Sequence, residues 1–123
     1  MLFDTKVYDK TEGLIVPNNG VGSFRANYNG FMKLSATVWT ANGAGNLWIK
    51  VLRRTTNSTV IQEAGAIGNT NNTYCTLNVS EAIFPVSAGD VIWVAIFSSN
   101  GNKPSTNNDS GGNHTMITME ALL

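Results

Sequence analysis

The chain has 123 residues, a formal net charge of zero, a charged fraction of only 13% and a hydrophobic fraction of 42%. This composition excludes a disordered polymer, which would combine few apolar residues with a high net charge. It also argues against nucleic acid as a partner, because no cluster of basic residues exceeds the Arg53-Arg54 pair.

Short apolar segments separated by Gly, Asn, Ser and Thr recur along the chain, and helix signals are nearly absent. That pattern is typical of an all-β sandwich or barrel, and the length fits one domain over residues 1–123. In chain order we expect strands at Phe3–Val7, Gly13–Val16, Gly22–Asn27, Phe31–Thr40, Leu47–Arg54, Val60–Ala66, Thr73–Val79, Val91–Ser98 and Thr115–Leu122.

Turn signals lie between these segments, and the clearest are "TTNS" at 55–58 and "SAGD" at 87–90. In the second turn we expect Gly89 to supply backbone freedom and Asp90 to cap the turn locally. The long polar stretch Asn100–Asn113 is predicted to be a loop, and it is either a functional loop or a plain solvated connection. The only cysteine, Cys75, excludes an intrachain disulfide and is expected to be a buried thiol.

The alternation of side chains along the strands separates an inner face from an outer face. In the strand at 31–40, one side carries Met32, Leu34, Ala36 and Val38. In the strand at 47–54, the inner side carries Leu47, Ile49 and Val51. The same alternation places Trp39 and Trp48 on outer faces.

The segment "VSAGDVIWVAIFSS" at 86–99 departs from this alternation, because both sides of its strand are apolar. An antiparallel sandwich strand normally shows one polar side. A contact between subunits is the simplest cover for the second side. The residues that we expect at this interface are Val91, Trp93, Ala95, Phe97 and Met116.

Three segments resemble the C1q/TNF-like superfamily of trimeric jelly rolls. "NGFMKLSATV" is similar to the family's entry to a long strand, "NLWIKVLRR" to the strand that follows, and "FPVSAGDVIWVAIFSS" to its Gly-Asp-x-Val/Ile stretch. The resemblance implies an antiparallel jelly-roll β-sandwich that assembles as a homotrimer, with the strand after Gly89-Asp90 along the trimer axis.

The low charge, the abundance of Asn, Thr and Gly, and a start without a Sec-type signal look more like a bacteriophage tail-needle knob or fibre head. By analogy, the chain would be a non-catalytic virion component, made in a bacterial cytoplasm, that contacts a host glycan or receptor and other virion proteins. A purely structural decoration or capping protein of a phage or spore-like particle, or a protein of the bacterial surface, remains an alternative. No apolar run approaches the roughly 20 residues of a membrane helix.

The sequence offers little for catalysis or for cofactors. The single histidine, His114, could join Ser110 and Asp109 in a hydrolase triad only if the long loop folded back on itself. A polar residue between loop and strand is the simpler interpretation, and a small glycan esterase or hydrolase stays a remote alternative. One histidine and one cysteine do not make a zinc site, and no cofactor is expected.

Binding of a sugar is the more reasonable hypothesis for a site. Glycan sites combine exposed aromatic faces with amide or carboxylate groups for the hydroxyls. The residues that supply these groups are Trp39, Trp48, Tyr28, Tyr74, Asn107, Asn108 and Asp109. The same aromatic side chains could instead pack at subunit interfaces.

Overall fold

The computed structural model describes residues 13–18, 22–41, 46–69, 75–98, 105–107 and 116–123, and for residues 39–41, 69, 75, 98 and 105–107 it describes the backbone alone. The described chain is all β. Its strands are β1 (Ile15–Pro17), β2 (Ser23–Ala26), β3 (Gly30–Ala41), β4 (Asn46–Arg54), β5 (Val60–Asn69), β6 (Cys75–Val86), β7 (Val91–Ser98), β8 (Ser105–Asn107) and β9 (Met116–Leu122).

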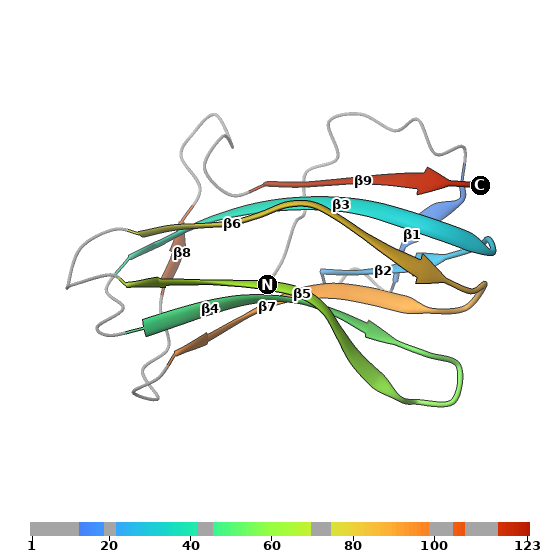
Figure 1. Ribbon diagram of the computed structural model, residues 1–123, viewed down its shortest axis with the longest axis horizontal. Coiled ribbons are helices and arrows are strands. Elements are labelled where there is room, and N and C mark those ends of the chain that lie inside the picture. The colour runs from blue at the N-terminus through green and yellow to red at the C-terminus, as the bar shows by residue number, and fades with distance from the viewer. Residues whose placement is uncertain (1–12, 19–21, 42–45, 70–74, 99–104, 108–115) are drawn as a thin grey trace.

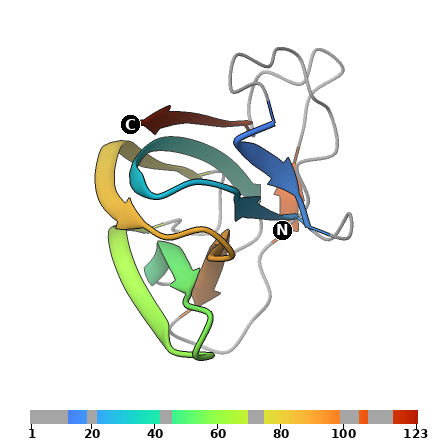
Figure 2. The ribbon, with the colours of Figure 1, turned by 90° about the vertical axis from the view of Figure 1, so that its right-hand side faces the viewer.

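The strands form two antiparallel sheets that pack face to face (Figure 1). One sheet has five strands in the order β1-β2-β7-β4-β5. The other has β3 at its centre, with β6 on one side and both β8 and β9 on the other, where they pair with successive parts of β3. Figure 2 shows the layers end on, with β5 and β6 at the side where the two sheets approach each other.

The core between the sheets follows the alternation read from the sequence. Side chains of β3, β4 and β7 that point inward are almost fully buried, and β6 adds Phe84. The largest fully buried side chains are Phe84, Met32, Leu34, Leu47, Ile49, Leu77, Ile92, Val38, Val51 and Val94. The prediction of the inner faces of β3 and β4 is therefore confirmed.

The expected strand at Thr73–Val79 is too short. β6 runs on to Val86, because a bulge at Ser80 and Glu81 opposite Ser35 absorbs the polar interruption, and the backbone N–H of Glu81 donates to Ser35 Oγ at 2.9 Å. Glu81 adopts a φ of 51°, which a strand pattern in the sequence does not reveal.

The loop predicted at Asn100–Asn113 also needs correction. Residues Ser105–Asn107 form the short strand β8, which pairs with the end of β3. β9 leaves β3 at Thr37, so the edge of β3 beyond that residue is open for another strand. The expected strand at Phe3–Val7 lies outside the described residues.

The "SAGD" turn behaves as predicted. The N–H of Asp90 donates to the carbonyl of Ser87 at 3.0 Å, and Asp90 Oδ2 accepts the N–H of Ser87 at 2.9 Å. Gly89 has a φ of 97°, a conformation that costs a residue with a Cβ roughly 1–2 kcal/mol. The turn thus fixes where β7 starts and which of its residues point outward.

Candidate recognition surface

The outer face of the five-stranded sheet is rich in apolar and aromatic side chains. β7 places Trp93 next to Leu52 of β4, and Phe97 next to Trp48. β5 extends the surface on the far side of β4. We call this surface the aromatic face, and its apolar members are Trp48, Leu52, Val60, Ile67, Val91, Trp93, Ala95 and Phe97.

Two cations of β4 lie on this aromatic face. Lys50 Nζ is 4.5 Å from the centre of the Phe97 ring, and the guanidinium carbon of Arg54 is 5.9 Å from that of Trp93. Their aliphatic stems cover apolar surface while their charges stay in water. This arrangement explains why Trp93 is half-buried, although Phe97 remains 44% exposed. The chain thus covers part of the second face of β7 by itself.

The charge of the aromatic face is one-sided. Arg25 of β2 lies beside Val91 and joins Lys50 and Arg54 as a third cation. Among the described residues, the carboxylates lie elsewhere: Glu63 and Asp90 bind Arg53, and the two others are on the opposite sheet. The described part of this face therefore carries positive charge without compensation.

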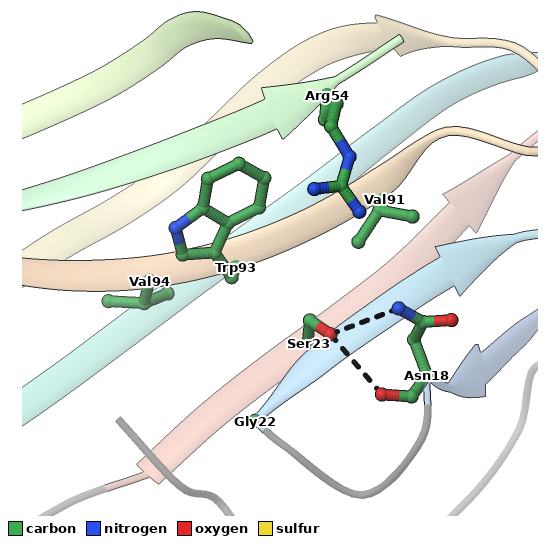
Figure 3. A pocket seen from close by; sticks show the side chains of 7 residues that line it. All are labelled: Asn18, Gly22, Ser23, Arg54, Val91, Trp93 and Val94. Atoms are coloured by element: carbon green, nitrogen blue, oxygen red, sulfur yellow. Dashed lines mark hydrogen bonds between the residues drawn. The ribbon is translucent and has the colours of Figure 1, made fainter. Parts of the chain in front are cut away.

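A shallow pocket of about 260 Å³ opens on the aromatic face between β2, β4 and β7 (Figure 3). Arg54 and Trp93 form one side. Ser23 and Asn18 form the other, where Asn18 Nδ2 donates to Ser23 Oγ and the Ser23 hydroxyl donates to the carbonyl of Asn18, both at 3.3 Å. Val91 lies between the two sides, and Gly22 and Val94 complete the lining. The pocket thus combines an aromatic ring, a guanidinium and a hydroxyl.

The outer face of the four-stranded sheet is a second uncovered apolar surface. Its apolar members are Phe31, Ile83, Pro85, Met116 and Leu122, of which Ile83 is 60% exposed. Its charges have both signs: Lys33 pairs with Glu81 at 3.5 Å, and Glu120 lies opposite Lys33 on β9. We call this surface the mixed face.

A buried ionic cluster holds one end of the sandwich. Arg53 donates from Nε to Glu63 at 2.8 Å and from Nη1 to Asp90 at 2.9 Å, and the Asp90 side chain is only 2% exposed. Burial by itself would lower the pKa of Arg53, but hydrogen bonds to Glu63 and Asp90 together with their charges outweigh it and raise that pKa. Asp90 is therefore a structural anchor for the turn and for β4.

The residues predicted to bind a sugar differ in their exposure to solvent. Tyr28 was expected to present an exposed ring, and this prediction is wrong: its side chain is buried at 6% exposure, and its hydroxyl donates to the carbonyl of Phe31 at 2.7 Å. Trp48 does lie on the aromatic face, half-buried.

Two further candidates are brought together by their backbones. Trp39 of β3 pairs with Asn107 of β8, so these two residues are neighbours in the sheet. Their side chains, together with Tyr74, Asn108 and Asp109, lie outside the described residues. That part of the sugar hypothesis stays a prediction.

The residues predicted at a trimer interface fall on two different surfaces. Val91, Trp93, Ala95 and Phe97 lie on the aromatic face, whereas Met116 lies on the mixed face of the other sheet. The two groups therefore do not form one continuous patch of the chain.

The described residues include no group of three or more His, Cys, Asp and Glu side chains that could hold a metal ion. Within the same residues, no helix is long and apolar enough to cross a membrane. His114 and Ser110, considered above for a triad, lie outside the part of the chain that the structure describes.

No protein-family model matches the chain, and no curated protein matches it. Solved structures do match the chain. Crystal structures of murine APRIL at pH 8.5 and at pH 5.0 superpose on this chain with TM-scores of 0.66 and 0.67, respectively. The chain has a TNF-like jelly-roll fold. Both structures are 17% identical to it, and the matches cover 85% and 86% of this chain and 72% and 75% of those chains. The jelly-roll part of the sequence prediction is thereby confirmed.

Proposed function

We propose that this chain is a non-catalytic recognition module that assembles as a homotrimer through the mixed face and turns the aromatic face outward. The observation that carries the proposal is that both outer faces of the sandwich expose large apolar side chains. Monomeric soluble proteins rarely leave such surface uncovered without a partner. Two uncovered faces suggest two kinds of partner.

Only one of the two faces can line a threefold axis. The outer faces of a sandwich point in opposite directions, and contacts on opposite sides build an open stack instead of a closed ring. Residues at a threefold axis meet copies of themselves. The aromatic face would then bring three sets of uncompensated cations together, whereas the mixed face offers both signs for pairing between chains.

The use of the charged side chains supports binding over catalysis. Of the described carboxylates, Glu63 and Asp90 are occupied by Arg53, and Glu81 pairs with Lys33. The aromatic face instead presents tryptophan rings, with the Ser23 oxygen as a hydrogen-bond acceptor and guanidinium groups as donors beside them, which suits recognition of a glycan.

We extend the proposal to the place where the module acts. The low charge and the abundance of Asn, Thr and Gly support display on a bacteriophage tail or fibre, with a glycan or receptor on the host surface as the partner. Adjacent tail or capsid genes are the outcome expected in the genome, and a neighbourhood without them would contradict this part.

Light scattering at micromolar concentration tests the assembly. We expect the mass of three chains for the wild type. Ile83→Asp should give monomers or aggregates because it replaces an apolar side chain of the seam with a charge that is costly to bury. Phe97→Asp, the matched change on the aromatic face, should leave the trimer intact. A monomeric wild type would refute the assembly, and dissociation by Phe97→Asp alone would move the seam to β7, where the sequence first placed it.

A glycan array tests recognition. We expect the wild type to bind at least one glycan, and Trp93→Ala to bind it more weakly because the ring supplies contact area. Background signal for both proteins would contradict the proposed glycan recognition but would not bear on the proposed trimer.

A further inference from the structure

We propose that the pocket between β2, β4 and β7 binds a sugar that carries a carboxylate, with Arg54 gripping the carboxylate and Trp93 packing against the ring. The inference rests on the proposed function and narrows it, because it names both the ligand class and the place on the aromatic face where that ligand binds.

Arg54 is the group that selects an anion. Its neighbour Arg53 points inward and is held by two carboxylates, whereas Arg54 is exposed at the pocket, and among the described residues no carboxylate pairs with it. Its only contact described is with the Trp93 ring. A planar guanidinium offers two parallel N–H donors that match a carboxylate, so this side chain is prepared to bind one.

The register of the sheet reinforces the positive charge at this position. Arg54 of β4, Val91 of β7 and Arg25 of β2 are aligned in one row across three adjacent strands. Strands in a sheet lie roughly 4.8 Å apart, so the two arginines flank Val91 about 10 Å from each other. Arg25 does not line the pocket, and its Nε donates to Asn27 Oδ1 at 3.1 Å, so it adds positive charge to the surroundings while Arg54 supplies the direct contact with an anion.

The next row of the sheet supplies the groups that recognise a sugar ring. Trp93 faces Leu52 on one side and Ser23 on the other. An indole offers a flat apolar surface for the C–H side of a sugar. The Ser23 hydroxyl donates its proton to the carbonyl of Asn18, and its oxygen can accept a hydrogen bond from a ring hydroxyl.

The pocket is small and open, and its size suits a single sugar ring. Its volume of about 260 Å³ lies just below the range of about 300–1,000 Å³ that drug-sized ligands occupy. A peptide of glutamates would pair its carboxylates with Arg54 but would bring no flat C–H face to the indole. A terminal acidic sugar uses Arg54, the indole and the Ser23 oxygen.

Ligand-observed NMR with two methyl glycosides tests the proposal. Methyl glucuronide and methyl glucoside differ only in that the first carries a carboxylate in place of a hydroxymethyl group. We expect the wild type to bind the glucuronide at least about tenfold more tightly, since hydrogen bonds to a charged group contribute about 1.5–3 kcal/mol. Added salt should reduce the difference.

Two charge-removing variants make the test specific. Arg54→Gln should bring the two sugars to equal affinity, whereas Lys50→Gln, which removes the same charge from the same strand outside the pocket, should keep the preference. Both side chains extend toward solvent, so neither variant should unfold the chain. Trp93→Phe, a second probe of the ring contact, should weaken both sugars alike.

Equal binding of the two sugars by the wild type would overturn the inference, and so would a preference that survives in Arg54→Gln. A polyglutamate peptide that binds through Arg54 while neither sugar binds would assign the pocket to an acidic protein segment instead. These outcomes can be told apart from failure of the proposed function. Array binding restricted to neutral glycans would contradict only the proposal of an acidic sugar. A monomeric wild type would contradict only the proposed trimer.

Discussion

Neighbouring arginines of β4 have opposite roles, which follow from the alternation of the strand. Arg53 points inward between Glu63 and Asp90, and Arg54 points outward to Trp93. In the sequence the two residues look like one basic pair. In the structure Arg53 stabilises the fold through its ion pairs, whereas Arg54 is available to bind a ligand. Alternation predicts that the two diverge, but it does not reveal the carboxylates that meet Arg53.

This difference predicts a large asymmetry in stability. Arg53→Leu leaves Asp90 buried without its cation, and breaking a buried pair in this way costs roughly 3–5 kcal/mol. Arg54→Leu loses only an exposed contact between a cation and a ring, about 0.5–1 kcal/mol. Guanidinium unfolding curves at equal protein concentration measure both, and similar midpoints for the two variants would contradict the structural role of Arg53.

Tyr28 gives the molecule a defined sensitivity to alkali. Burial raises the pKa of its phenol to about 12, from 10 in the unfolded chain. The unfolded state therefore ionises first: the stabilisation is fully present below pH 10 and is lost as the pH rises through 12. A shift of this size corresponds to roughly 3 kcal/mol.

The measurement is the difference in unfolding free energy between wild type and Tyr28→Phe across pH 8–12. At pH 8 the variant should be less stable by about 1 kcal/mol, because the hydrogen bond to the carbonyl of Phe31 is lost. That deficit should shrink and then reverse towards pH 12. A deficit that stays constant over this range would show that the phenol is not shielded as described.

At the scale of elements, the sequence predicts strands well where alternation and a turn coincide. β7 was expected at Val91–Ser98 and is found there, because the Ser87–Asp90 turn sets its start and its inner residues are uninterrupted. β6 extends beyond the expected end at Val79 and reaches Val86. In the structure a bulge absorbs Glu81, and Pro85 is tolerated since β6 is the last strand of its sheet.

The candidate site is harder to predict from the sequence than the strands are, because it depends on which strands are neighbours. Alternation alone places Trp48 on an outer face, but it does not decide the side of Trp93 and Phe97, because both sides of β7 are apolar. The pocket needs Ser23, Trp93 and Arg54 side by side, and their adjacency depends on the strand order β2-β7-β4. That order joins segments about 30 to 70 residues apart, which no local pattern encodes. The prediction of an exposed ring for Tyr28 is wrong because the residue type alone does not show whether the ring points into the core or toward solvent.

At the scale of the whole molecule, the sandwich closes a complete core and still leaves apolar side chains on the mixed face. Phe31, Ile83 and Met116 are all substantially exposed there in one chain. Burying a side chain of this size contributes roughly 1.5–3 kcal/mol, and a threefold assembly repeats that gain in every copy. Folding and assembly should then be linked by mass action, since the assembled form binds its sister chains and the unfolded form does not.

That linkage predicts a thermal midpoint that depends on concentration. The wild type should unfold at a higher temperature as protein concentration is raised tenfold, because each unfolding event must also separate the chains. Ile83→Asp, if it remains folded as a monomer, should show a lower midpoint that does not change with concentration. Phe97→Asp, on the opposite face, should retain the wild-type dependence and thereby separates lost assembly from a general effect of a new surface charge. A concentration-independent midpoint for the wild type would show that the mixed face is not an assembly surface, and the apolar residues on it would then require a partner other than a copy of this chain.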